Sequence, residues 1–359
     1  MKYKIKVSKT QQSQLPKLDF NHIPFGKVFS DHMFIADYRD GKWQDLRIVP
    51  FQNFSLHPAN MTLHYSQTIF EGMKASKDVN GIPLLMRPEM HARRLNLSAD
   101  RMVMPNVPEE LFLQAIHELI GLDQAWIPPA DMEGSLYVRP YMFATDEFIG
   151  VKPSATYKFV IFTCPVGAYY SKPVNLVTEQ KYVRAVNGLT GEAKAGGNYA
   201  SSLYPAKKAQ EGGFDQVIWM ESPEFKKIQE VGTMNLFFVI GDKVITPATT
   251  GAILRGITMD CFKTILKDKG ITVEARDIYI DEILEAYMDG QLKEAFGAGT
   301  AAVVSHIASI THNDTLMTLP PIADRTIGNM LKAEIDGLRA GTVADKFGWL
   351  TKINVPVGA

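Results

Sequence analysis

The sequence predicts an α+β protein of two domains, and three observations lead to that fold class. The chain has 359 residues, which exceeds what one small hydrophobic core usually serves and is a common length for two domains. Segments typical of strands and segments typical of helices occur in both halves. They do not alternate as strictly as in a doubly wound parallel sheet, which favours α+β.

The first half contains one clear helix and two strand-like runs. Apolar residues repeat at helical spacing from 111 to 120, directly after Pro108-Glu109-Glu110, which is a good helix start. Strand-like runs follow at Ser135–Tyr141 and Lys158–Cys164. Next, residues 165–173 begin and end with proline and lack periodicity, so the interdomain connection is expected there. The predicted division is a smaller domain at 1–164, a loop at 165–175 and a larger domain at 176–359.

The second half mixes strands and helices. A helix is expected from Asn198 to Glu211, ending at Gly212-Gly213 as a C-terminal cap. An apolar face that includes Met259 and Leu266 predicts a helix ending before Gly270, and another helix is expected from Asp281 to about Met288. The predicted strands are Asp215–Glu221, Lys227–Val231, Asn235–Ile240 and Lys243–Thr246.

Composition and charge narrow the possible partners. The 38 basic and 39 acidic residues leave a formal net charge of -1, so neither a nucleic acid nor an anionic membrane is an expected partner. Cys164 and Cys261 cannot supply a disulfide framework, and no metal site is expected. No apolar stretch approaches the roughly 20 residues of a membrane span, and no apolar core of a signal peptide follows the first lysines. A cytoplasmic protein is therefore expected.

Common catalytic motifs do not explain the chain. The eight histidines form no HExxH pattern, and there is no Walker loop and no GxSxG elbow. What remains is a lysine among small residues, two Gly-Thr loops, several arginines and a glutamate in a strand. Taken singly, Lys194 fits a solvated loop lysine, Glu230 an edge-strand carboxylate and Arg94 a helix-face arginine.

Read together and in order, these segments resemble the branched-chain amino acid aminotransferases, in particular their longer, eukaryote-like subgroup that also occurs in bacteria. That family belongs to the fold-type IV pyridoxal-phosphate enzymes, whose two-domain fold is that of D-amino acid aminotransferase. The resemblance spans residues 25–337 and is carried by Phe25–Met33, Leu63–Ser66, Phe70–Ala75, Arg93–Leu95, Ser135–Pro140, Tyr182–Ala185, Gly191–Tyr199, Glu230–Asn235 and Gly297–Ala301.

The resemblance implies pyridoxal 5'-phosphate as cofactor, and it implies a role for each matching residue. Lys194, in the larger predicted domain, would hold the cofactor covalently and carry the proton of the substrate. Glu230 would pair with the ring nitrogen and keep it protonated. Tyr199 would bind the ring hydroxyl. The phosphate would be gripped by Arg94, by the helix start at Ile257 and Thr258, and by Thr300. Two further positions match cofactor-binding residues, Thr233 and Arg184.

The implied substrates are small amino acids and 2-oxo acids: L-leucine, L-isoleucine or L-valine as donor and 2-oxoglutarate as acceptor, in ping-pong order. Thr300 and Ala301 would hold the α-carboxylate together with Tyr137. Arg139 would meet the second carboxylate of glutamate. The apolar walls would be Phe25, Tyr65 and Tyr169.

The resemblance also implies a homodimer, because Tyr65, Ile149 and Val151 match residues that reach the site of the neighbouring subunit. One departure is informative: mammalian members carry a redox Cys-x-x-Cys where this chain has Ala302 and Ser305, so thiol regulation is not expected there. Two alternatives stay open. One is a D-amino acid aminotransferase or an aminodeoxychorismate lyase of the same fold, and the other is a protein that binds pyridoxal phosphate without turnover.

Overall fold

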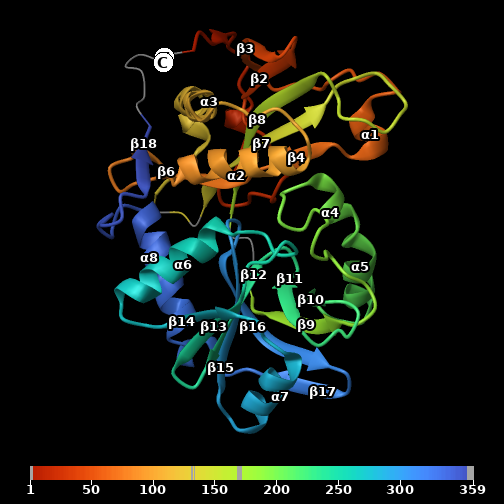
Figure 1. Cartoon of the computed structure of the whole chain (residues 1–359). Coiled ribbons are helices and arrows are strands. Elements are labelled where there is room, and N and C mark those ends of the chain that lie inside the picture. The colour runs from red at the N-terminus through yellow and green to blue at the C-terminus, as the bar shows by residue number, and fades with distance from the viewer. Residues whose placement is uncertain (1–2, 131, 133, 168–171, 354–359) are drawn as a thin grey trace. The chain divides into compact units, whose positions relative to one another are not determined.

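The computed structural model describes the chain except for residues 1–2, 131, 133, 168–171 and 354–359. It divides into two compact units (Figure 1). Unit 1 contains the described residues of Met1–Tyr169, Ala193–Gly196 and Asp336–Ala359. Unit 2 contains those of Tyr170–Glu192 and Gly197–Ile335. Each unit holds helices and one mixed sheet, which agrees with the predicted α+β class.

Unit 1 is built on a nine-stranded sheet in the order β1-β3-β2-β8-β7-β5-β6-β18, with β4 paired to β7. The neighbours are antiparallel except for β1 and β3. The predicted strands at 135 and 158 are the long central pair, β7 and β8, each extending beyond its predicted end. The strands of this sheet are β1 (Lys6–Val7), β2 (His32–Arg39), β3 (Lys42–Pro50), β4 (Thr68–Phe70), β5 (Met73–Lys77), β6 (Pro83–Met86), β7 (Ser135–Ala144), β8 (Tyr157–Val166) and β18 (Leu350–Lys352).

Two long helices cover the core of unit 1, α2 (Pro88–Arg101) and α3 (Glu109–Leu122). The structure confirms α3 as an amphipathic helix whose apolar residues are buried. Residues 91, 94 and 98 of α2 lie on one buried face, because spacings of three and four bring residues to the same side of a helix. The remaining helical segments of this unit are short: η1 (Leu15–Lys17), α1 (Met61–Tyr65) and η2 (Gln124–Trp126).

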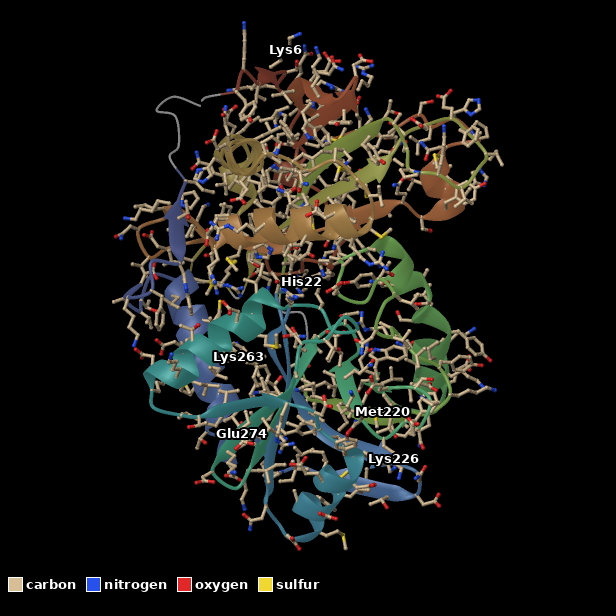
Figure 2. The ribbon with its side chains drawn as sticks, viewed as in Figure 1. Lys6, His22, Met220, Lys226, Lys263 and Glu274 are labelled. Carbon is tan, nitrogen blue, oxygen red and sulfur yellow. The ribbon has the colours of Figure 1, made fainter. Side chains whose placement is uncertain are left out.

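Unit 2 has its own nine-stranded sheet in the order β11-β10-β9-β16-β15-β12-β13-β14, with β17 paired to β16. Parallel pairing joins β9 to β10 and to β16, and β13 to β14. At the β14 edge, Glu274 (Figure 2) forms an ion pair with Lys243 of β13 at 3.1 Å. The strands are β9 (Val174–Glu179), β10 (Gln216–Met220), β11 (Ile228–Val231), β12 (Asn235–Ile240), β13 (Lys243–Pro247), β14 (Val273–Arg276), β15 (Leu292–Gly299), β16 (Val303–His312) and β17 (Thr315–Thr318).

The three helices predicted in unit 2 are present with one correction, and the helix over 327–339, which begins in unit 2, was not predicted. The single helix expected from Asn198 to Glu211 is two helices, α4 (Gly196–Ala200) and α5 (Leu203–Glu211). The hydroxyls of Ser201 and Ser202 bond the carbonyls three residues back, and Pro205 has no N–H for the next helical bond, so the helix restarts. The other helices are α6 (Ile257–Asp268), α7 (Ile280–Met288), η3 (Ile322–Asp324) and α8 (Ile327–Arg339).

The boundary of the two predicted domains differs from the observed division in three ways. The predicted loop at 165–175 overlaps β8, where Pro165 pairs with Leu136, and β9, which begins at Val174. Residues 193–196 group with unit 1 because Ala195 pairs with Ile69. The end of the chain also groups with unit 1, since β18 pairs with β6 (Figure 1). These long-range pairings leave no periodicity in the local sequence.

The start of α8 is held by a buried carboxylate of unit 2. Glu294 on β15 accepts hydrogen bonds from the backbone N–H groups of Thr326, Ile327 and Gly328 at 2.7 to 2.8 Å. A carboxylate at a helix N-terminus satisfies amide donors that have no partner inside the helix. Glu294 is therefore a structural carboxylate, and it provides a comparison for the carboxylates considered below.

Candidate functional site

Lys194 is held in unit 1 by its own backbone. Its N–H donates to the hydroxyl of Ser98 on α2 at 2.9 Å, and its carbonyl accepts from the N–H of Phe70 at 3.0 Å. Its side-chain amine lies 4.7 Å from the centre of the Phe70 ring. Gly196 must stay small because a Cβ there would lie 2.7 Å from Thr68. The half-buried lysine is thus fixed against β4 and α2.

A buried ion cluster joins α2 to Glu71, the residue that follows β4. Arg94 donates from Nε and Nη2 to the two carboxylate oxygens of Glu71, at 2.7 and 2.8 Å. Nδ1 of His91 lies 2.6 Å from Oε2 of Glu71. An ionised carboxylate accepts hydrogen bonds and cannot donate them, so Nδ1 of His91 carries the proton in this contact. The predicted phosphate-binding arginine is therefore fixed in a bidentate ion pair.

The pKa values of this cluster follow from burial and charge. Burial by itself raises the pKa of Glu71, but the Arg94 charge and the hydrogen bonds from Arg94 and His91 outweigh it, so this pKa lies well below its ordinary value. Burial lowers the pKa of His91, although Glu71 opposes this effect, and the charges of Arg94 and Lys194 lower the pKa further. At neutral pH the cluster therefore holds an ionised Glu71, a charged Arg94 and a neutral His91.

This arrangement predicts a loss of stability in mild acid. The unfolded chain binds a proton at His91 below a pKa of about 6.5, whereas the folded protein does so only at lower pH. Unfolding therefore takes up a proton in this window, and stability falls as pH drops below about 6.5. We expect the melting temperature of His91→Asn, which keeps a nearby N–H donor, to fall less steeply from pH 7 to 5 than that of the unmodified protein. His22→Asn, at a site whose side chain is 85% exposed, should keep the steeper fall. Equal slopes for all three proteins would contradict the assignment.

Three predicted substrate-binding residues form a chain of contacts, and one of them, Arg139, lies on the ring of Phe70. The guanidinium of Arg139 lies 4.6 Å from the ring centre of Phe70 and donates to the hydroxyl of Tyr137 at 2.9 Å. Tyr137 and Arg139 are two residues apart on β7, so their side chains share one face of the sheet. Phe25 contacts Tyr137, with ring centres 6.0 Å apart. Unit 1 thus brings Phe25, Tyr137 and Arg139 together with Lys194.

Unit 2 holds the one carboxylate predicted to bind the cofactor, Glu230 of β11. This side chain is buried, and its Oε2 lies 2.6 Å from Nη2 of Arg184. Arg184 also donates to the carbonyl of Ala252. Asn235, the first residue of β12, donates to Oε1 of Glu230 at 3.1 Å. A buried carboxylate with an ion pair and an amide donor is favoured in its charged form.

The start of α6 is connected to Glu230. Asn235 also donates to the carbonyl of Leu254 at 3.0 Å, two residues before Gly256, which is the N-cap of α6 and provides no side-chain cap. Ile257 and Thr258, the predicted phosphate-binding residues, are the first two residues of this helix and are buried. Glu230, Arg184 and the start of α6 therefore form one connected group of unit 2.

The other cofactor positions of unit 2 lie in turns and a short helix. Thr300 and Ala301 are half-buried in the turn between β15 and β16, and β15 pairs with the start of β12 through Ala298 and Asn235. Thr233 is exposed in the turn between β11 and β12. Tyr199 is half-buried in α4, where its carbonyl accepts from the hydroxyl of Ser202 at 2.7 Å.

The remaining predicted residues lie in an exposed group of unit 1, or they are not among the residues that the structure describes. Tyr65 in α1, together with Ile149 and Val151 in the loop between β7 and β8, forms an exposed group. The N–H of Phe148 in this loop bonds the carbonyl of Ala59 just before α1. Tyr169, predicted to line the substrate pocket, lies outside the described residues.

The sequence reasoning did not assign a role to Glu71, His91 or Asn235. Glu71 lies in Phe70–Ala75, one of the segments that resemble the family. His91 precedes Arg94 by three residues on α2, which places both side chains on one face of the helix. Asn235 follows Glu230 by five residues across a turn. These three positions were visible in the sequence. Which side chains contact one another, however, is decided by the fold.

The described residues contain neither a candidate metal cluster nor a helix that could span a membrane. Among these residues, histidine, cysteine and carboxylate side chains form no cluster of three or more that could hold a metal ion. In the same part of the chain, no helix has both the length and the apolar character required to cross a bilayer.

Comparison with known proteins places these residues in a family. The family model described as Amino-transferase class IV matches residues 68–310. Branched-chain-amino-acid aminotransferase 2 of Bacillus subtilis is 46% identical over 342 residues, which covers 94% of each chain. The branched-chain-amino-acid aminotransferase of Mycolicibacterium smegmatis is 40% identical and covers 92% of each chain.

Solved structures of such enzymes share the fold. The branched-chain amino acid aminotransferase of Escherichia coli is 25% identical, with a TM-score of 0.74, and the match covers 90% of this chain and 99% of that one. The branched-chain amino acid aminotransferase of Thermobaculum terrenum, solved in its PLP form (holo form), is 24% identical. Its TM-score is 0.71, and the match covers 89% of this chain and 98% of that one.

Proposed function

The chain belongs to the class IV aminotransferases and is a branched-chain-amino-acid aminotransferase, and from this premise we propose how it works. It transfers the amino group of L-leucine, L-isoleucine or L-valine to 2-oxoglutarate, with pyridoxal 5'-phosphate as cofactor and in ping-pong order. The observation that carries the proposal is the fixed position of Lys194, whose backbone N–H and carbonyl are both hydrogen-bonded within unit 1.

We propose the cytoplasm as the location of the protein. The two cysteines of the chain, Cys164 and Cys261, are buried free thiols, which suit a reducing compartment.

The residues present fit this cofactor by their chemistry. Pyridoxal phosphate, when bound, supplies the electron sink for the charge left on the substrate after the α-proton is removed. Lys194 offers the amine that holds the cofactor and carries this proton. Glu230, kept charged by Arg184, suits a protonated ring nitrogen. Arg94 and the N-terminus of α6, with Ile257, Thr258 and Thr300, suit the phosphate. Tyr199 would donate a hydrogen bond to the ring hydroxyl or accept one from it. Thr233 is proposed as a further contact of the cofactor.

The proposed substrate pocket places aromatic side chains next to an arginine, so it can accept either an aliphatic side chain or a carboxylate. Phe25 and Tyr137 give aromatic surface for an aliphatic side chain, with Tyr65 and Tyr169 as the other proposed walls. Arg139 is assigned to the second carboxylate of glutamate. Its Nε has no hydrogen-bond partner among the described residues, so it retains a donor for an anion. The α-carboxylate is assigned to Tyr137 and to the N–H groups of Thr300 and Ala301.

A half-reaction tests the cofactor and the ping-pong order. In this order the amino donor leaves as a 2-oxo acid before 2-oxoglutarate binds. Protein loaded with pyridoxal phosphate should therefore convert L-leucine to 4-methyl-2-oxopentanoate without any acceptor, in an amount equal to the bound cofactor. Mass spectrometry of the oxo acid measures this yield. Product that forms only when both substrates are present would exclude the ping-pong order.

We propose that the working form is a homodimer whose sites take residues from both subunits. The support within this chain is an exposed apolar group in unit 1, formed by Leu63, Tyr65, Phe148, Ile149 and Val151, of which Val151 is 89% exposed. The N–H of Phe148 bonds the carbonyl of Ala59 just before α1, which brings this loop close to that helix, and exposed apolar residues that cluster often mark a protein–protein interface. Tyr65, Ile149 and Val151 would complete the substrate pocket of the neighbouring subunit.

Mixing two inactive variants tests this shared site. Lys194→Ala removes the lysine of its own subunit, and Tyr65→Ala combined with Val151→Ala removes the contribution to the partner. After unfolding and refolding together, a mixed dimer has one site with both defects and one with neither. We therefore expect activity to return to about one quarter of that of the unmodified protein, because random pairing yields half mixed dimers. No recovery, with mixed dimers shown by mass spectrometry, would contradict the shared site.

A further inference from the structure

Asn235 has a buried side-chain amide, and the proposed function assigns it no role. It is 6% exposed, and its Nδ2 donates both to Oε1 of Glu230 and to the carbonyl of Leu254. Both partners accept hydrogen bonds and neither can donate in this state, so the amide nitrogen and not the amide oxygen must face them. The two hydrogens of one amide group are thus used on two separate segments of unit 2.

The oxygen of the same side chain meets the start of α6. A Cβ placed on Gly256 would overlap Oδ1 of Asn235, so the glycine permits this close approach. Gly256 is the N-cap of α6 and has extended backbone angles that any residue can adopt, φ -68° and ψ 129°. Glycine is therefore required here for space and not for conformation. Asn235 contacts the carboxylate through its nitrogen and the helix start through its oxygen.

We propose that Asn235 is a positioning residue that fixes the carboxylate of Glu230 relative to the N-terminus of α6. The inference rests on the proposed function, which assigns Glu230 to the ring nitrogen of the cofactor and α6 to its phosphate. The ring nitrogen and the phosphate belong to one small molecule, so the groups of the protein that bind them must lie within the reach that its covalent structure allows. Asn235 acts through Glu230 and α6, and it sets their spacing without being a catalytic residue.

A substitution of equal shape tests the donor role. Asn235→Asp removes both N–H donors and places a second carboxylate beside Glu230. Two adjacent carboxylates share a proton as pH falls, and the shared proton restores a donor between them. We expect pyridoxal phosphate to bind about 10- to 100-fold more weakly than to the unmodified protein at pH 8, the range for a lost hydrogen bond to a charged group, with partial recovery at pH 6. The visible absorbance of bound cofactor during titration of the apoprotein measures this.

Asn329→Asp is the matched control. Asn329 of α8 also donates twice through its Nδ2, to the carbonyls of Ile322 and Arg325 at 2.7 and 2.6 Å. The same chemical change there should leave the affinity for pyridoxal phosphate and its pH dependence unaltered. If Asn235→Asp does not fold, Asn235→Ala gives the same comparison without the added charge. Unaltered affinity in the Asn235 variant that folds would overturn the positioning role.

A double-mutant cycle tests the contact with α6 separately. Gly256→Ala should weaken cofactor binding about 10-fold or more, because the new methyl group displaces Asn235. In the Asn235→Ala background the same change should have little further effect, since the displaced oxygen is gone. Thermal unfolding of the four apoproteins should show the same coupling without cofactor. Additive effects of the two substitutions would overturn the proposed contact. Failure of the unmodified protein to bind pyridoxal phosphate would refute the proposed function. In that case the unfolding of the four apoproteins still tests the contact.

Discussion

Lys194→Ala is expected to reduce glutamate formation from L-leucine and 2-oxoglutarate by about 100- to 10,000-fold, the usual contribution of a positioned proton-transfer group. Covalent attachment of the cofactor should be lost as well. Borohydride reduction followed by peptide mass analysis would then find no cofactor fixed at position 194. The change removes side-chain atoms only, so the backbone bonds to Ser98 and Phe70 can remain.

An exposed lysine provides the control for this loss. Lys207 on α5 is 72% exposed and forms a 3.7 Å ion pair with Glu211, and such surface pairs contribute little. Lys207→Ala should keep the rate of the unmodified protein. A near-normal rate for Lys194→Ala, with the substitution verified by mass, would remove Lys194 from the mechanism and with it the central assignment.

Glu230→Gln is expected to keep the cofactor bound but to lower kcat about 100-fold, a typical loss for one electrostatic contact to developing charge. Glutamine retains the shape and can still accept a hydrogen bond from Asn235. It cannot balance a protonated ring nitrogen, so the electron sink becomes weaker. The measurement is kcat together with the amount of bound cofactor at saturating substrates.

Stability must be separated from catalysis in this variant, because the change leaves the buried charge of Arg184 without its partner. Glu294→Gln is the matched control: it also removes a buried carboxylate from unit 2, at the start of α8. Both variants should melt at lower temperature, and only Glu230→Gln should lose kcat when measured well below its melting temperature. Unchanged kcat in a folded Glu230→Gln would show that its carboxylate is not needed for the reaction.

Much of the secondary structure could be predicted from local patterns. The helix α3 follows Pro108, has two glutamates in its first turn and carries an apolar stripe, and its predicted existence is confirmed. The break between α4 and α5 was missed because it depends on serine hydroxyls that bond their own backbone. Such competition is decided residue by residue and leaves the average helical pattern intact.

Long-range pairing limited the prediction of the domains. The grouping of Lys194 with unit 1 depends on the contact of Ala195 with Ile69, and that of the last residues on the pairing of β18 with β6. Neither contact leaves a periodic signal in the sequence. The interdomain loop, which was placed by its flanking prolines and its lack of periodicity, therefore overlaps two strands.

The sequence identifies the residues of the candidate site one by one and not their partners. The resemblance implies roles for Lys194, Glu230 and Arg94, and the structure adds which residues hold each of them. Arg94 is held by Glu71, a residue 23 positions earlier in the chain, and Glu230 is held by Arg184 and Asn235. These partners act through hydrogen bonds between distant segments, which single-sequence patterns do not reveal.

The most direct test of the account compares two amino donors in one assay. The initial rate of glutamate formation is measured with 2-oxoglutarate, added pyridoxal phosphate and either L-leucine or D-alanine. The account predicts rapid turnover with L-leucine and none with D-alanine, which establishes the reaction and the chirality of the donor together. Turnover with D-alanine and none with L-leucine, by protein that has bound the cofactor, would contradict the proposed substrate.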